Sequence, residues 1–205
     1  MKKLILLVSA LLLTVSTGAF AAGRPYLGGS AGLFFPSDST ITDDFGASAE
    51  VSFDTGLLIS GFGGLAFDNG FRLEGELSYR AADLDELREP GFPDTRVNSE
   101  ISATSMMASA YYDMKTLTTV TPYVGGGIGL SNVNLERGTF DGGGWRSDDE
   151  TVFAFQVGAG VGIAVNPRVA IDLGYRYFAT EDVRFDQFDA ELESHNVAVG
   201  MRYMF

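Results

Sequence analysis

Few residues in this chain of 205 have the types and spacing that catalysis requires. His195 is the single histidine, and Ser194 precedes it. A serine nucleophile needs its histidine on the same face of a strand, whereas consecutive strand residues point to opposite faces. The residue two positions after His195 is Val197, which carries no polar group. We therefore expect no enzyme activity and no catalytic residue, and we place His195 at the outer rim as an ordinary polar residue.

Metal, cofactor and nucleic-acid sites have little support in this sequence. The chain has no cysteine and one histidine, which excludes thiolate and multi-histidine metal sites. The run Asp148-Asp149-Glu150 offers oxygen ligands, but the spacing of a calcium loop is missing. Glycines in 125–129 and 158–162 continue alternating segments, whereas a nucleotide loop joins a strand to a helix. A formal charge of −13 disfavours nucleic acid, so we expect no metal, no cofactor and no nucleic-acid partner.

Charged residues that alternate with large apolar residues form the one consistent pattern. In segment 71–80, charged and small polar residues take the even positions, while Phe, Leu, Gly and Tyr take the odd ones. Segments 155–165 and 169–177 alternate in the same way. A period of two over about ten residues indicates a strand whose two faces meet different solvents. The polar residues that we expect to share one interior are Arg72, Glu74, Glu76, Arg80, Gln156, Asp172, Arg176 and Arg202.

The strands that position these residues are separated by short and long connections in strict alternation. Residues 68–70, 115–120 and 166–168 are the short connections, and the long ones contain 22 of the 27 acidic residues. The expected strands are 25–35, 55–67, 71–81, 99–114, 121–134, 151–165, 169–178 and 195–205. A soluble barrel would also alternate, but long aliphatic faces opposite small and charged ones suit lipid outside and a narrow lumen inside. We predict an all-β, eight-stranded, antiparallel transmembrane barrel in up-and-down order, closed because an open edge is not tolerated in lipid.

The first 21 residues have the form of a cleaved signal peptide. Lys2 and Lys3 precede an apolar stretch, and Ala19-Phe20-Ala21 matches the small-residue cleavage pattern. A retained anchor helix is the alternative, although the apolar stretch is short for a span. We expect cleavage after Ala21, with the barrel formed by residues 22–205.

The end of the chain carries the most specific signal. Val197, Val199, Met201, Tyr203 and Phe205 alternate up to the last residue, whereas chain ends usually fray into water. With Tyr26-Leu27-Gly28-Gly29 and Pro122-Tyr123-Val124-Gly125, this strand resembles the small eight-stranded outer-membrane barrels of Gram-negative bacteria, the OmpA-like and Opa-like, porin-like surface proteins. The resemblance covers essentially the whole expected mature chain, and it implies short periplasmic turns and longer extracellular loops. No segment matches the peptidoglycan-binding domain that some of those relatives carry.

The resemblance also implies partners and a location. Tyr203 and Phe205 match the C-terminal aromatic signal that the barrel-insertion machinery reads. We expect a monomer in the outer membrane, in contact with its lipid and lipopolysaccharide, delivered by periplasmic chaperones. The lumen of eight strands is just wide enough to be filled by side chains, so its charges are expected to pair as a plug. We therefore expect a structural or cell-surface role; a surface adhesin or host-ligand binder and a small-solute or ion channel are the alternatives.

Overall fold

Eight long strands form the wall of the protein. The computed structural model describes residues 23–37, 39–42, 48–88, 99–137, 146–181, 183–185, 188–190 and 192–205. The wall strands are β1 Gly23–Pro36, β4 Gly56–Phe67, β5 Phe71–Arg88, β6 Ser99–Asp113, β7 Val120–Arg137, β8 Arg146–Asn166, β9 Val169–Thr180 and β12 Glu193–Met204. Four short strands lie in the long connections: β2 Ser39–Thr42, β3 Ser48–Phe53, β10 Val183–Phe185 and β11 Phe188–Ala190.

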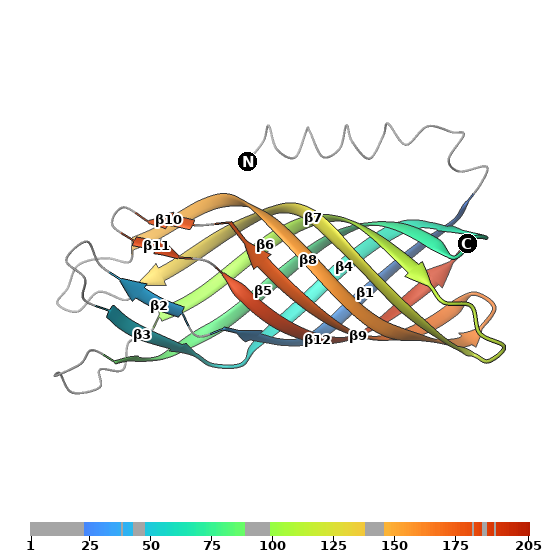
Figure 1. Ribbon diagram of the computed structural model, residues 1–205, viewed down its shortest axis with the longest axis horizontal. Coiled ribbons are helices and arrows are strands. Elements are labelled where there is room, and N and C mark those ends of the chain that lie inside the picture. Colours follow the sequence, from blue (N-terminus) through green and yellow to red (C-terminus); the bar gives the residue numbers. More distant parts are fainter. Residues whose placement is uncertain are drawn as a thin grey trace.

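The wall closes on itself in meander order. Each wall strand pairs antiparallel with the next one along the chain, and β1 pairs with β12 from Tyr26–Met204 to Pro36–Ser194. The ring order is therefore β1-β4-β5-β6-β7-β8-β9-β12, and the strands run obliquely along the long axis (Figure 1). This confirms the prediction of a closed, eight-stranded antiparallel barrel.

Exposed and buried side chains alternate along the wall strands. On β5, Leu73 and Leu77 are 53% and 59% exposed, while Glu76 between them is 2% exposed. The outer surface is apolar around the ring, because Leu27, Val157, Leu173 and Val199 are also exposed. Such a surface suits lipid, while the polar groups are turned inward. In the described part of the chain, no helix has the length and hydropathy of a membrane span.

The short connections are tight turns with local side-chain support. Gly70, between β4 and β5, has φ of 93°, a backbone conformation that glycine adopts without strain. Asn69 accepts a hydrogen bond from the amide of Phe71 in the same turn. Between β8 and β9, Asn166 accepts bonds from the amides of Arg168 and Val169. These turns set the register of the hairpins and bring both described chain ends, Gly23 and Phe205, to one end of the barrel.

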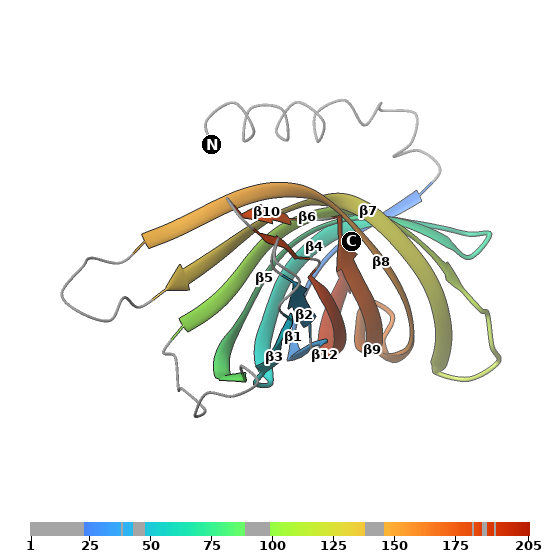
Figure 2. The same cartoon turned by 60° about the vertical axis from the view of Figure 1, so that its left-hand side comes forward.

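Several wall strands continue beyond their predicted ends. β5 extends to Arg88, β7 to Arg137, and β8 begins at Arg146, because their backbones stay paired past the apolar alternation. β3 pairs with the extension of β5, and β2 pairs with β3. From the direction of Figure 2, β7 and β8 run together to the end that carries the four short strands. The β1–β4 and β9–β12 connections, predicted as loops, therefore contain hairpins, formed by β2–β3 and β10–β11.

Candidate functional site

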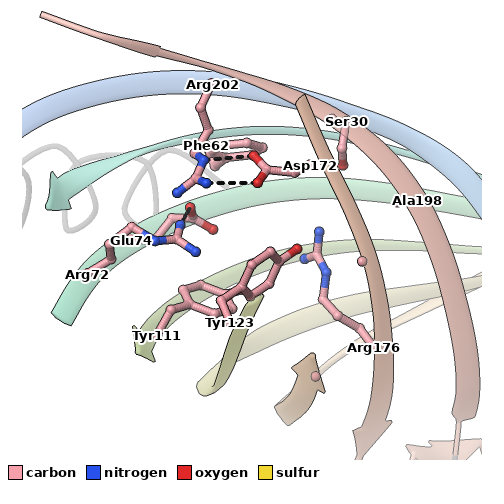
Figure 3. Close-up of a pocket in the computed structure, with 13 residues that line it drawn as sticks. Ser30, Phe62, Arg72, Glu74, Tyr111, Tyr123, Asp172, Arg176, Ala198 and Arg202 are labelled. Carbon is pink, nitrogen blue, oxygen red and sulfur yellow. Dashed lines mark hydrogen bonds and ion pairs between the residues drawn. The ribbon is translucent and has the colours of Figure 1, made fainter. Parts of the chain in front are cut away.

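The candidate site is the interior of the barrel, where long side chains from opposite walls meet (Figure 3). Glycines on the inner face make room for these side chains. A Cβ atom on Gly125 would lie 2.3 Å from the Tyr111 ring, and one on Gly158 would lie 2.7 Å from Cγ of Arg176. The glycine segments that resemble nucleotide loops lie within β7 and β8, so their place in the fold is that of packing residues.

Arg202 on β12 and Asp172 on β9 form a bidentate ion pair near the short-turn end (Figure 3). Nη2 of Arg202 donates to Oδ1 of Asp172 at 2.8 Å, and Nε lies 2.7 Å from Oδ2. Nη1 of Arg202 lies 3.9 Å from Oδ2 of Asp113 on β6. Since β6 and β12 are opposite each other in the ring, these contacts begin to bridge the lumen.

Arg72 on β5 is the second cation at this level. Its Nε donates to both carboxylate oxygens of Asp113 at 2.9 Å, and its Nη1 lies 3.6 Å from Oε2 of Glu74. The guanidinium carbon is 4.9 Å from the ring centre of Tyr111 and 5.1 Å from that of Tyr123. Aromatic faces and carboxylates together compensate for the water that this buried cation has lost.

Arg176 and Glu76 form the pair at mid-height. Nη1 of Arg176 donates to Oε2 of Glu76 at 2.5 Å, and the Glu76 side chain is fully buried. The pair joins β9 to β5, which are opposite strands of the ring, so the bond spans the lumen. We call Arg72, Glu74, Glu76, Asp113, Asp172, Arg176 and Arg202 the lumen network.

A small cavity of about 40 Å³ lies within the lumen network and is lined by Arg72, Glu74, Asp172, Arg176 and Arg202. Its walls include Ser30, which has a small side chain, and Gly174 and Gly200, which lack a Cβ atom, so the space is left open. A volume of this size holds about three water molecules. Among the described residues, three buried acceptors lack a hydrogen-bond partner: Oε1 of Glu76, Oε1 of Gln156 and Oε2 of Glu150. Water is the partner that such buried groups usually have.

Arg80 lies further toward the long connections. The groups that offset the burial of its charge differ from those around the other three arginines of the lumen. Its Nη1 donates to the hydroxyls of Ser78 at 3.0 Å and Ser105 at 3.1 Å, and its guanidinium carbon is 4.0 Å from the ring centre of Phe178. Among the residues whose side chains are described, no carboxylate forms an ion pair with it. Its Nε also donates to Oδ1 of Asn196 at 3.4 Å. Arg80 is only 1% exposed, so its charge depends on neutral hydroxyl and amide groups, a ring face and longer-range attraction.

An apolar layer fills the lumen beyond Arg80. All eight wall strands contribute to this layer, so it extends across the whole ring. The layer consists of Phe34, Leu58, Ala82, Ala103, Met107, Val133, Val152, Ala154, Phe178, Leu192 and Ala198. Sequence reasoning missed this layer, because strands with a mixed inner face show no clear alternation there.

The eight residues expected to share the interior all lie on the inner face. Seven of them are buried, and Arg176 is half-buried. Sequence reasoning did not select Asp113, whose carboxylate pairs with Arg72 and lies 3.9 Å from Arg202. Tyr26 was also missed, and its hydroxyl donates to Glu74 at 2.9 Å. Counting two-residue steps from Ser105 and Ser109 along β6 would have placed Asp113 inside.

His195 and Ser194 point to opposite sides of the wall, as expected. Ser194 is fully buried, whereas His195 is exposed on the outer face. Nδ1 of His195 lies 2.6 Å from the hydroxyl of Tyr175, and the two rings stack with 6.0 Å between their centres. In the described part of the chain, no group of three or more acidic or histidine side chains has the arrangement of a metal site. The side chains of Asp148 and Asp149 lie outside the described residues.

The residues of the predicted assembly signal and of the predicted cleavage site belong to the two ends of the sequence. Tyr203 and Phe205 are both exposed on the outer face, with ring centres 5.3 Å apart. Aromatic residues at this position are typical of the belt where a barrel wall leaves the bilayer. Ala19 and Ala21, the expected cleavage residues, lie outside the described residues.

Two curated proteins match part of this sequence. Over 125 residues, the chain is 28% identical to outer membrane protein PagN of Salmonella typhimurium, covering 53% of this chain and 52% of PagN. Over 95 residues it is 33% identical to an uncharacterized protein of Brucella abortus, covering 39% of this chain and 31% of that protein. The chain therefore spans about half or less of the length of these curated relatives.

Two solved structures have a similar fold. Neisserial surface protein A superposes with a TM-score of 0.56 at 21% identity, over 88% of this chain and 97% of that one. OprG from Pseudomonas aeruginosa superposes with a TM-score of 0.59 at 15% identity, over 90% and 96% of the two chains. At these identities the likeness concerns the fold.

The model of the outer membrane protein beta-barrel domain family matches residues 6–205, nearly the whole chain. Together with the closed ring and the apolar outer surface, this places the protein in the outer membrane of a Gram-negative bacterium. The chain belongs to the outer membrane protein beta-barrel domain family.

Proposed function

We propose that this protein is a closed membrane anchor with a structural role at the cell surface, and that its lumen does not conduct. The observation that carries the proposal is the filling of the described lumen by two successive layers. The lumen network extends from the short-turn end to mid-height, and the apolar layer begins at that level and continues toward the long connections.

The lumen network opposes ion flow through its charge pairing. An ion that enters must displace Arg176 from Glu76 or Arg202 from Asp172, and each buried ion left unpaired costs several kcal/mol. The cavity of about 40 Å³ is a pocket for a few waters, which is far smaller than a continuous aqueous path.

The apolar layer adds a second obstacle. Side chains such as Phe34, Leu58 and Phe178 are at most 2% exposed, so they are packed against one another. An ion that crosses this layer loses its hydration and meets only neutral polar groups, such as the buried hydroxyls of Ser105 and Ser131, among the described apolar side chains.

Planar-bilayer recording of the refolded protein tests the proposal. We expect the wild type to show no steady conductance above that of the protein-free bilayer. Large, steady, ion-selective conductance would replace the anchor proposal with the channel alternative.

A second candidate function is binding of a host or cell-surface ligand through the extracellular connections. The extensions of β5, β7 and β8 support it, because these strands stay paired beyond the belt of exposed apolar residues. The paired backbone therefore forms a sheet outside the part of the wall that faces lipid. The hairpin of β2 and β3 is attached to this sheet through β5. Strands give such a surface a more defined shape than an irregular loop has.

Replacing residues 38–53, which include β2 and β3, with a short Gly-Ser connection tests this candidate. We expect the barrel to fold unchanged, because its eight wall strands are kept. If the candidate is correct, adhesion of expressing cells to host-cell or matrix surfaces falls for this variant. Adhesion equal to that of the wild type, or no adhesion by either protein, would remove this hairpin from the function.

Export and assembly are part of the same proposal. Cleavage after Ala21 predicts that the mature protein begins at Ala22, which N-terminal sequencing measures. Phe205→Lys is expected to reduce insertion in cells, because it removes the terminal aromatic of the assembly signal. Val165→Lys, at an exposed position of β8 near the same rim, is the matched control and is expected to insert.

A further inference from the structure

Three ring side chains form a cluster on the outer face of β9 and β12. His195 is the register partner of Tyr177, and their ring centres lie 5.6 Å apart. The Tyr175 ring stacks on the imidazole at an angle of 22°, and its hydroxyl lies 2.6 Å from Nδ1 of His195. All three residues occupy the same alternate positions as the exposed Leu173 and Val199, so they face outward together. We call Tyr175, Tyr177 and His195 the ring cluster.

The ring cluster lies at the depth of the lipid headgroups on the extracellular side. On the outer face of β12, His195 and Phe205 are ten residues apart, and Phe205 belongs to the aromatic pair at the periplasmic rim. A strand rises about 3.3–3.4 Å per residue and tilts by about 40°, so this separation is about 25 Å along the barrel axis. The apolar band of an outer-membrane barrel is about 25 Å tall and has an aromatic girdle at each end. The ring cluster is therefore part of the extracellular girdle.

The polar groups of the ring cluster suit a sugar better than a phosphate. The contact with Tyr175 occupies Nδ1 of His195, and in the described part of the chain Nε2 has no hydrogen-bond partner. Glu193 follows at the next outward position of β12 and is partly exposed, and its backbone carbonyl accepts a bond from the amide of Ser37. A carboxylate accepts hydrogen bonds from hydroxyl groups but repels a phosphate. A sugar ring offers hydroxyl groups to Nε2 and to the carboxylate, and an apolar face to the aromatic rings.

We propose that the ring cluster binds the sugar headgroup of a glycolipid in the extracellular leaflet. The rings of Tyr175 and Tyr177 pack against the apolar face of the sugar, Nε2 of His195 bonds one hydroxyl, and Glu193 accepts from another. The depth of the cluster assigns the sugar to a lipid, because a soluble glycan reaches the wall only above the headgroups. The inference depends on the outer-membrane location and not on closure of the lumen, so each proposal can fail without the other.

Phe71 and Tyr112 form an exposed ring pair of different chemistry at the periplasmic rim. Their ring centres lie 5.2 Å apart, and the side chains are 51% and 42% exposed. The pair has two rings and one phenol hydroxyl, but no imidazole, because His195 is the single histidine of the chain. It therefore serves as the internal control for what aromatic rings alone contribute at a membrane interface.

Displacement of a quenching lipid tests the proposal. The chain has one tryptophan, Trp145, and the Phe155 ring lies 6.2 Å from that of Tyr177, so Trp145→Phe with Phe155→Trp places a reporter beside an intact ring cluster. The protein is refolded into brominated phosphatidylcholine vesicles that contain an equal fraction of unbrominated glucosyl diacylglycerol, a sugar without phosphate, or unbrominated phosphatidylglycerol, a phosphate without sugar. We expect the glucosyl lipid to relieve quenching more. His195→Phe keeps a ring but loses Nε2, and is expected to reduce this preference about five-fold.

The controls separate this site from general contact between rings and lipid. Tyr175→Phe removes the hydroxyl that positions the imidazole and is expected to lower the preference, whereas Tyr112→Phe at the control pair is expected to leave it unchanged. A Phe71→Trp reporter in place of Phe155→Trp is expected to show little preference. Heat-modifiable migration on gels establishes that each variant is folded, and Tyr175→Phe decides the question if His195→Phe does not refold.

Three results would overturn the proposal. The first is equal relief of quenching by the two lipids, or greater relief by phosphatidylglycerol. The second is a preference for the glucosyl lipid that survives both His195→Phe and Tyr175→Phe. The third is loss of the preference when soluble methyl glucoside is added, because this would assign the ring cluster to a soluble glycan. We expect methyl glucoside to have no effect.

Discussion

At the scale of single residues, the most consequential contact in the lumen is the Arg176–Glu76 pair, because it joins opposite strands. Removing one partner leaves the other buried and unpaired, which costs about 3–5 kcal/mol. We therefore expect Glu76→Leu to lower the free energy of unfolding in vesicles by about that amount. The double variant Glu76→Leu with Arg176→Leu is expected to cost less than the single one. A loss in the double variant equal to the sum of the losses of Glu76→Leu and Arg176→Leu, measured by urea titration as a double-mutant cycle, would mean that the pair is uncoupled.

Arg80 is expected to respond differently, since it has no described carboxylate partner. Arg80→Met keeps most of the volume beside Phe178 and removes the cost of burying a cation. It also removes the donor to Ser78, Ser105 and Asn196, of which Ser105 keeps its hydrogen bond with Ser131. We expect a change within about 1 kcal/mol of the wild type, far below that of Glu76→Leu. A loss of the same size, by the same titration, would show that Arg80 has full electrostatic compensation in the lumen.

Which residues enter the lumen could be predicted, but which of them pair could not. The two-residue period assigned Arg72, Glu76 and Arg176 to the inner face without any three-dimensional information. Partner choice depends on ring closure, which brings β9 opposite β5 and β6 opposite β12. Asp113 was not selected because β6 carries small and apolar residues on both faces.

At the scale of one strand, β5 allows the facing of the wall to be tested by depth. Leu73 is 53% exposed on the outer face, so Leu73→Arg places a cation against lipid. The expected loss of stability is about 2–4 kcal/mol if the site lies near the midplane, and about 0–1 kcal/mol at the interface. Phe71→Arg, two residues nearer the rim on the same face, is the matched control with the smaller loss. A larger loss at position 71 than at 73, by urea titration in vesicles, would contradict the depth assignment.

Strand type and order could be predicted from the sequence, whereas strand length could not. Apolar alternation ends where lipid contact ends, but backbone pairing continues, as in the extension of β5 to Arg88 against β3. Hydrogen bonding rather than lipid contact sets these outer ends, and polar residues at such positions give no periodic signal. The same limit explains why β2, β3, β10 and β11 were expected to be loops.

At the scale of the whole molecule, two layers of side chains block the lumen, and either layer alone is expected to prevent ion flow. The lumen network and the apolar layer lie one after the other along the axis, so loss of one leaves the other in place. Glu76→Ala alone is therefore expected to reduce stability without steady conductance, because an ion still meets Phe34, Leu58 and Phe178. Phe178→Ser alone is expected to leave the ion pairs closed.

Only the combination of the two substitutions opens both obstacles at once. We expect Glu76→Ala with Phe178→Ser to show steady conductance in planar bilayers, because water that enters through the space left by the Phe178 ring meets an unpaired Arg176 rather than a closed pair. The apolar control Phe178→Leu with Glu76→Ala keeps the apolar layer and is expected to stay closed. Conductance from Glu76→Ala alone, equal to that of the double variant, would mean that the lumen network is the only barrier and that the apolar layer already admits water.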